Sequence, residues 1–89
     1  MALIIDVRGK SPRIAENCFL AENATIIGDV EIGNGSSVWF QSVIRADVHE
    51  IRIGKEVNIQ DGAIIHCTYE KAGTYIGDRV SIGHRAIVH

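Results

Sequence analysis

The sequence predicts an all-β fold, a three-sided parallel β-helix of about four coils. Aliphatic residues recur at steps of six, mostly with a small or β-branched residue four positions later, and Gly, Asn and Asp lie between them. The aliphatic positions are Ile14, Leu20, Ile26, Ile32, Val38, Ile44, Ile53, Ile59, Ile65, Ile76, Ile82 and Val88. Six residues hold three strand periods, so each hexapeptide predicts a short strand and a bend. Three hexapeptides per coil predict a solenoid whose coils stack about 4.8 Å apart.

The repeat also predicts how the chain is organised. Residues 14–89 are expected to form the coils. Residues 1–13 contain Pro12, the only proline, and are expected to be an extended N-terminal segment that covers the open end of the first coil. We therefore expect one hexapeptide-repeat domain over residues 1–89.

Two interruptions break the six-residue step. Ile44 and Ile53 are nine residues apart, and Ile65 and Ile76 are eleven apart. Beside the second interruption, Tyr69 is the one departure from the small or β-branched residue at the fourth position. We expect both insertions to be loops pushed out of the prism.

Composition excludes several classes of function. The 89 residues are 46% hydrophobic and 22% charged, as in a small globular domain, and the net charge of −2 offers no basic field for nucleic acid or an anionic membrane. The N-terminal apolar stretch of four residues is too short for a signal peptide or a membrane span, which predicts a cytoplasmic protein. Cys18 and Cys67 form no CxxC pair and are expected to be free thiols.

The coil count brings distant residues into one column. Three hexapeptides per coil place the strands at Ile44, Ile65 and Val88 above one another. The residues that follow them, and so share one outward-facing column, are Arg45, His66 and His89. Imidazole nitrogen suits Zn²⁺, and three protein ligands leave a position for water. Two histidines on neighbouring strands can share one ion.

His84 is expected on a different face, because it follows Ile82 by two residues. It points away from the histidine column, but a neighbouring prism could present it. A homo-oligomer with metal at its interfaces is therefore a geometric inference, and three copies would form three such sites. We expect His49 to be an exposed polar residue, and Cys67 to pack inward without binding metal.

Further polar residues are expected near this corner. Arg45 and Asp47 both face outward if their strand continues, which favours an ion pair between them or with a partner chain. An arginine beside a metal could also hold an anion such as bicarbonate. Gln60 and Asp61 lie one face before His66. They form either a simple Asp-Gly turn or a group in which Gln60 orients a metal-bound hydroxide.

Three stretches carry a resemblance to a known family. They are GDVEIGNGSSVWFQSVIRADVHEIRIG, VNIQDGAIIH and YIGDRVSIGHRAIVH. In order and spacing they resemble the gamma-class carbonic anhydrases, which are left-handed β-helix homotrimers. The resemblance implies the left hand, with His66 and His89 binding metal from one subunit and His84 from the next. It also implies zinc, with iron or cobalt possible, and reversible hydration of CO₂ to bicarbonate by metal-bound hydroxide at a subunit interface.

The same resemblance assigns roles and shows departures. It implies that Gln60 orients the hydroxide, that Asp61 is the acid beside it, and that Arg45 and Asp47 form an interfacial ion pair. Val48 stands where the archetypal enzyme has a proton-shuttling acid, and Glu70 lies in the loop that carries a second one. Members of the family are usually longer at the C-terminal end.

Two other functions stay open from the sequence. Hexapeptide prisms also host acyl-CoA-dependent transferases, which need one histidine as general base and a coenzyme groove built by later coils. A metal-binding trimeric scaffold without turnover is the other alternative. The three histidines favour the carbonic anhydrase type.

Overall fold

The computed structural model describes residues 2–68 and 72–89, which form eleven β-strands and no helix. The strands are β1 (Leu3–Ile5), β2 (Arg13–Ile14), β3 (Phe19–Leu20), β4 (Thr25–Ile32), β5 (Ser37–Val38), β6 (Val43–Ile53), β7 (Asn58–Ile59), β8 (Ile64–His66), β9 (Thr74–Ile76), β10 (Ser81–Ile82) and β11 (Ile87–Val88). This part of the chain accordingly contains no helix with the length and apolar character needed to cross a membrane.

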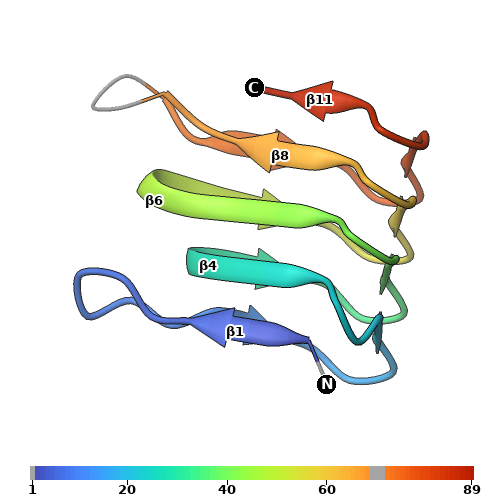
Figure 1. Cartoon of the computed structure of the whole chain (residues 1–89), viewed down its shortest axis with the longest axis horizontal. Helices are drawn as coiled ribbons and strands as arrows, with labels where there is room; N and C mark the ends of the chain where they lie inside the picture. Colours follow the sequence, from blue (N-terminus) through green and yellow to red (C-terminus); the bar gives the residue numbers. More distant parts are fainter. Residues whose placement is uncertain (1, 69–71) are drawn as a thin grey trace.

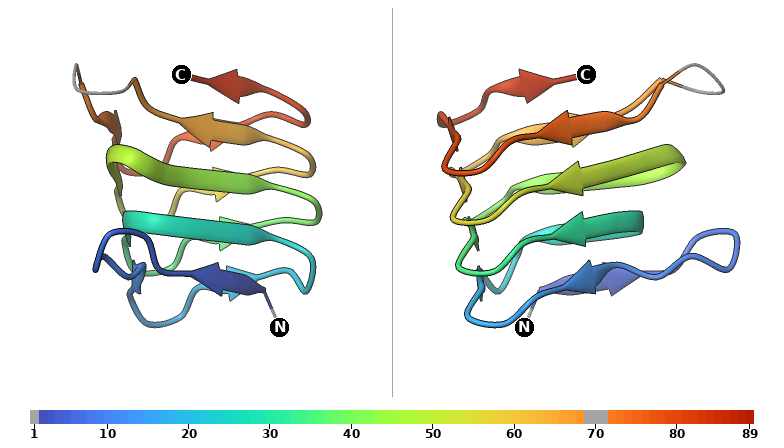
Figure 2. Two further views of the ribbon diagram at one scale, coloured as in Figure 1. Left: turned by 60° about the vertical axis from the view of Figure 1, so that its left-hand side comes forward. Right: turned by 180° about the vertical axis from the view of Figure 1, so that it is seen from behind.

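The strands stack in parallel around a three-sided prism (Figures 1 and 2). Face 1 holds β1, β8, β11 and the first halves of β4 and β6. Face 2 holds β2, β9 and the second halves of β4 and β6. Face 3 holds β3, β5, β7 and β10. In Figure 1 the chain runs leftward along face 1, returns behind and rises coil by coil, which is a left-handed path. The predicted fold class is confirmed.

Ile and Val side chains fill the prism because the register stacks them. Ile26, Ile44 and Ile65 are Cα partners on face 1, and each has no exposed surface. The β-branched side chain suits a pleated strand with one buried side. Since every coil repeats this position, the six-residue step of the sequence becomes a continuous core along the prism.

The first insertion stays within a strand. β6 is continuous from Val43–Ile53, and its register against β4 shifts so that Ala46 pairs with Gly28 while Ile51 pairs with Val30. The extra residues therefore form a bulge at the corner between faces 1 and 2, and the expected loop was wrong for this insertion. A bulge keeps the backbone extended and can re-aim side chains at the edge of a face.

The second insertion separates β8 from β9. An isolated antiparallel bridge joins Thr68 to Ala72 at its base. The expected departure at Tyr69 and the candidate acid Glu70 both lie outside the described residues.

The N-terminal segment is extended, and it pairs with the sheet. Leu3–Ile5 lies in parallel register with Thr25, Ile26 and Ile27 of β4. A bridge between Val7 and Lys10 then closes a turn before β2 begins. The segment thus adds the outermost strand of face 1.

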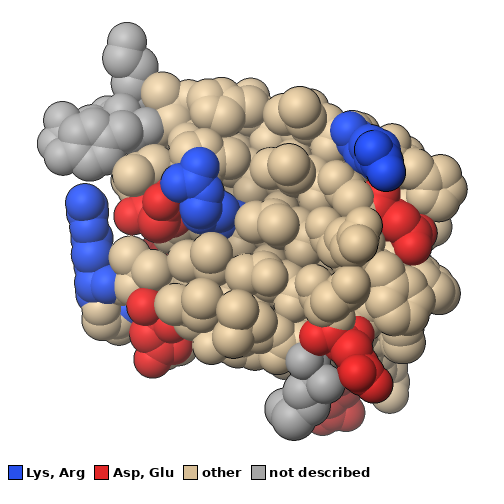
Figure 3. Space-filling model, in the orientation of Figure 1, with Lys and Arg blue, Asp and Glu red and all other residues tan. Residues whose placement is uncertain are grey.

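Faces 1 and 2 carry different outward side chains. The column on face 1 is Leu3, Thr25, Val43, Ile64 and Ile87. Ile64 is 42% exposed and Ile87 is 73% exposed, and Figure 3 shows uncharged side chains across the middle of this face. The corresponding column on face 2 is Arg13, Glu31, Arg52 and Tyr75. A mostly apolar strip along a face is typical of a contact surface.

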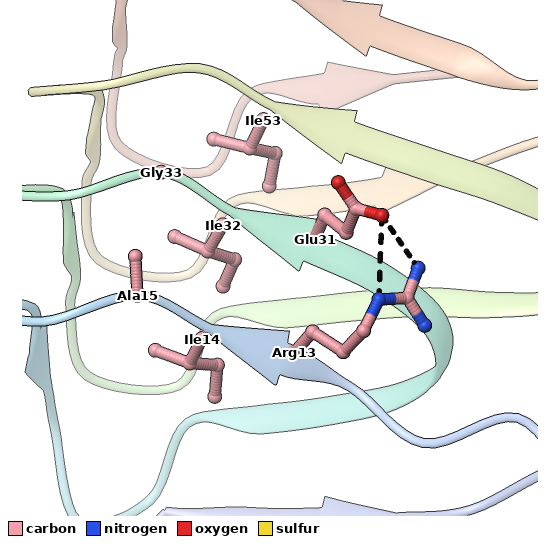
Figure 4. A pocket seen from close by; sticks show the side chains of 7 residues that line it. All are labelled: Arg13, Ile14, Ala15, Glu31, Ile32, Gly33 and Ile53. Carbon is pink, nitrogen blue, oxygen red and sulfur yellow. Dashed lines mark hydrogen bonds and ion pairs between the residues drawn. The ribbon is translucent and has the colours of Figure 1, made fainter.

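Ion pairs join three coils on face 2. Asp29 Oδ1 pairs with Nη2 of Arg13 at 3.0 Å and with Nη2 of Arg52 at 3.1 Å. Glu31 Oε2 pairs with Arg13 Nη2 at 2.8 Å. Figure 4 shows Arg13 and Glu31 pointing toward one another from neighbouring coils, beside a pocket. Burial by itself raises the pKa of Asp29, but the hydrogen bonds and charges of the two arginines outweigh it and lower the pKa.

The lowered pKa of Asp29 predicts an acid-sensitive contribution to stability. A depressed carboxyl pKa stabilises the fold above the unfolded-state pKa, and this contribution is lost as pH falls through the folded-state pKa. Asp29→Asn should therefore lower the free energy of unfolding by about 1 kcal/mol at pH 7, with the difference from wild type shrinking below about pH 4. Urea unfolding of both proteins at pH 7 and pH 3 measures it.

The control for this prediction is Glu56→Gln. Glu56 pairs with Arg79 at 3.9 Å, and both side chains are mostly exposed. The substitution should therefore lower the free energy of unfolding only slightly at either pH. An Asp29→Asn effect that is the same at both pH values would contradict the ion-pair explanation.

Candidate functional site

The predicted histidine column forms on face 1. Arg45 and His66 are Cα partners, and Val88 pairs with Ile65, so His89 follows in the next coil. The imidazole rings of His66 and His89 lie side by side, with centroids 5.2 Å apart. Residues that are more than twenty positions apart in the sequence thus become neighbours.

Asp47 joins this column from the β6 bulge. Its Oδ1 lies 3.0 Å from His66 Nε2, and its Oδ2 accepts Arg45 Nη1 at 2.7 Å. Burial raises the pKa of Asp47, but the hydrogen bonds from His66 and Arg45 outweigh it and lower the pKa. The predicted Arg45–Asp47 ion pair is therefore present within one chain. We call Arg45, Asp47, His66 and His89 half-site A.

Thr74 and Cys67 are neighbours of His66 in half-site A. Thr74 Oγ1 donates to the backbone carbonyl of His66 at 2.6 Å, which ties the end of β8 to β9. Cys67 is 1% exposed, and burial raises the pKa of its thiol. As predicted, Cys67 packs inward, and both cysteines are free.

The other predicted residues meet at the corner that follows face 3. Gln60, Asp61 and His84 line one pocket of about 270 Å³ together with Asn58 and Trp39. His84 Nδ1 lies 3.4 Å from Asp61 Oδ1, and the His84 side chain is 69% exposed. We call Gln60, Asp61 and His84 half-site B.

A buried serine fixes the backbone of half-site B. Ser42 is fully buried, and its Oγ donates to the carbonyl of Gln60 at 2.8 Å. Because a buried hydroxyl needs a partner, this bond anchors the start of the turn that follows Gln60 to the coil below. Asp61 and Gly62 form a turn, as one of the two alternatives from the sequence predicted.

The chain does not bring the three predicted ligands together. Among residues 2–68 and 72–89, no group of three or more His, Cys, Asp or Glu side chains is placed to hold a metal ion. His84 lies on a different face from His66 and His89, as the coil count predicts. His49 is half-buried in the β6 bulge, where its Nδ1 accepts the backbone N–H of Glu50 at 2.9 Å.

Sequence reasoning did not single out Trp39 as a neighbour of half-site B. The signal was present in the register, because Val38 and Ile59 are Cα partners and the residues that follow them are Trp39 and Gln60. A hydrophobic side chain at a solvent-facing position beside candidate polar groups could have marked it.

Comparison with known proteins agrees with this architecture. Residues 11–46 match the family described as bacterial transferase hexapeptide (six repeats). The chain is 41% identical over 97% of its length to "Gamma carbonic anhydrase 2, mitochondrial" of Arabidopsis thaliana. It is 51% identical over 85% of its length to "Probable carbonic anhydrase" of Methanocaldococcus jannaschii. The resemblance to the gamma-class carbonic anhydrases is confirmed.

A solved structure supports the fold. A putative acetyltransferase from Bacillus cereus matches 97% of the chain with a TM-score of 0.92 and 41% identity. The chain spans 33% of the Arabidopsis relative, 47% of the Methanocaldococcus relative and 49% of the Bacillus protein. Since one relative is named as mitochondrial, these names do not decide the cytoplasmic compartment predicted above.

Proposed function

We propose that this protein is a metal-dependent hydro-lyase of the carbonic anhydrase type, acting on CO₂ and bicarbonate between two copies of the chain. The observation that carries the proposal is the separation of the predicted residues into two half-sites. Half-site A presents two adjacent imidazoles and half-site B presents the third. Relatives named as carbonic anhydrases, 41% and 51% identical, support the reaction type.

The donor set fits a zinc-type ion. His66, His89 and His84 of a second copy would hold the metal, and neutral imidazole nitrogen is a preferred zinc donor. The 5.2 Å separation of the His66 and His89 rings is compatible with two ligands on one side of an ion. Such a metal would supply a nucleophile for CO₂ at neutral pH, because metal binding lowers the pKa of water to about 7. Iron or cobalt would suit the same ligands.

The exposed apolar strip on face 1 supports contact with a second copy of the chain. Ile64 and Ile87 are exposed beside half-site A, and a neighbouring prism would cover them. Because half-site A and half-site B lie on different faces, the contact between copies is heterologous, and such contacts form a ring when the rotation between copies closes. A homotrimer closes this ring with three equal sites.

The remaining residues have roles that follow from their contacts. Asp47 holds the His66 ring through Nε2 and is itself held by Arg45. The Arg45 side chain is 46% exposed beside the imidazoles, where it can attract the bicarbonate anion. Gln60 orients the reactants through its amide, and Asp61 steadies His84.

Metal analysis of the purified protein tests the proposal. Wild type should hold about one metal ion per chain and behave as a trimer, and His66→Ala should lose most of the metal, because one of three ligands is removed. His49→Ala is the matched control, since that histidine belongs to neither half-site. Elemental analysis measures the metal content, light scattering measures the oligomeric state, and stopped-flow kinetics measures CO₂ hydration.

The outcomes separate the alternatives. A monomer that takes up no metal on titration would overturn both the ligand set and the trimer. Stoichiometric metal with hydration at the buffer rate would leave the metal-binding scaffold as the function.

A further inference from the structure

Trp39 lies where half-site B opens to solvent. It follows β5 directly and lines the same pocket as Gln60, Asp61 and His84. It is half-buried, so part of the indole surface stays accessible. The pocket therefore has polar groups on one part of its lining and a large aromatic ring on another.

One hydrogen bond to Ser37, which is itself bonded to Asn58, and a ring contact with Phe19 hold the indole in one position. Its Nε1 donates to Ser37 Oγ at 3.0 Å, and Ser37 Oγ donates to Asn58 Oδ1 at 3.0 Å. The ring of Phe19 lies 4.7 Å from it, centroid to centroid. The indole N–H is the only polar hydrogen of the tryptophan side chain, so once it is bonded to Ser37 the exposed remainder of the ring is apolar.

We propose that Trp39 is a substrate-contacting residue of the site, the apolar wall against which CO₂ lies next to Gln60. This inference rests on the proposed function. CO₂ is uncharged and has no hydrogen to donate, whereas bicarbonate is an anion that polar groups bind. An apolar wall therefore favours the substrate of hydration over its product, and the fixed ring does so without losing side-chain freedom on binding.

Steady-state kinetics of three variants test this role. Trp39→Ala should raise the KM for CO₂ about tenfold with kcat within about twofold, because interactions equal in ground and transition state appear in KM. In the dehydration direction the same loss should appear in kcat, with the KM for bicarbonate unchanged. Trp39→Phe keeps an aromatic face and should restore most of the affinity.

Phe40→Ala is the matched control. Phe40 belongs to the same aromatic cluster, 6.4 Å from Trp39, but does not line the pocket. Its kinetics should stay close to wild type. A Trp39→Ala protein with wild-type KM, or a Phe40→Ala protein with the same defect, would overturn the inference.

Fluorescence gives a readout that does not depend on turnover. Trp39 is the only tryptophan in the chain, so all indole emission comes from this position. Titration with Co²⁺ should quench that emission saturably in wild type and not in His84→Ala. Co²⁺ loading without quenching would overturn the placement of Trp39 beside the site, whatever the catalytic activity.

The two proposals fail in different ways. A metal-loaded wild type that does not hydrate CO₂ would overturn both. A wild type that hydrates CO₂ while Trp39→Ala matches it would overturn only the role of Trp39.

Discussion

A mixture of His66→Ala and His84→Ala proteins is expected to recover metal binding and CO₂ hydration that neither variant shows alone. The His66→Ala copy keeps half-site B, and the His84→Ala copy keeps half-site A. Where these two halves face each other, the interface contains all three ligands. Random assembly of equal amounts should regenerate about one quarter of the sites.

The reason for this recovery is the geometry of the prism. His66 and His89 lie side by side on face 1, while His84 lies at another corner with Asp61. No complete ligand set forms within the described part of one chain. If a single chain held the site, each variant would carry its own defect and mixing would recover nothing.

Refolding the two variants together, then measuring bound metal and stopped-flow hydration, makes the test. A mixture of His66→Ala with His89→Ala is the control, because both substitutions damage half-site A and no interface can then be complete. Recovery in the control, or none in the first mixture, would contradict the interfacial site.

Gly28→Ala is expected to be the most destabilising of the substitutions considered. Gly28 has a φ of +81°, and a Cβ there would lie 2.2 Å from the backbone oxygen of Ala46. An alanine is strained in this left-handed backbone conformation, and its Cβ would displace the neighbouring coil. Together these effects should lower the free energy of unfolding by roughly 3 kcal/mol or more. Since Ala46 precedes Asp47 in the bulge, we also expect weaker retention of metal at His66.

Chemical unfolding at a fixed protein concentration measures this loss. Gly77→Ala is the matched control, because a Cβ at Gly77 meets nothing within 4 Å. That variant should be close to neutral, or stabilised by up to about 1 kcal/mol through the unfolded state. Equal effects at the two glycines would show that close approach of the coils does not decide the stability.

The six-residue step predicts the coil register on face 1 because equivalent repeat positions of successive coils pair in parallel there. Ile44 and Ile65 occupy equivalent repeat positions, and they are Cα partners in the structure. Alignment of Arg45 with His66 follows from that pairing alone. The location of His84 on another face follows from the same count.

The bulge in β6 was beyond the reach of the periodicity. The extra residues between Ala46 and Ile51 were expected to form a loop, but they belong to strand β6, and they place Asp47 within hydrogen-bond distance of His66. Whether an insertion leaves the sheet depends on contacts with the coils above and below it, which local sequence does not contain.

By itself, the sequence determined the coils, their register and the two groups of candidate residues, because a repeating step turns position in the chain into position in space. The tertiary structure alone decided the side-chain arrangement: Asp47 bonds to His66, Asp29 pairs with two arginines, and Trp39 lines one pocket with Gln60. These contacts depend on a bulge, on side-chain conformations and on hydrogen bonds between coils. None of them repeats every six residues, so no periodic pattern can report them.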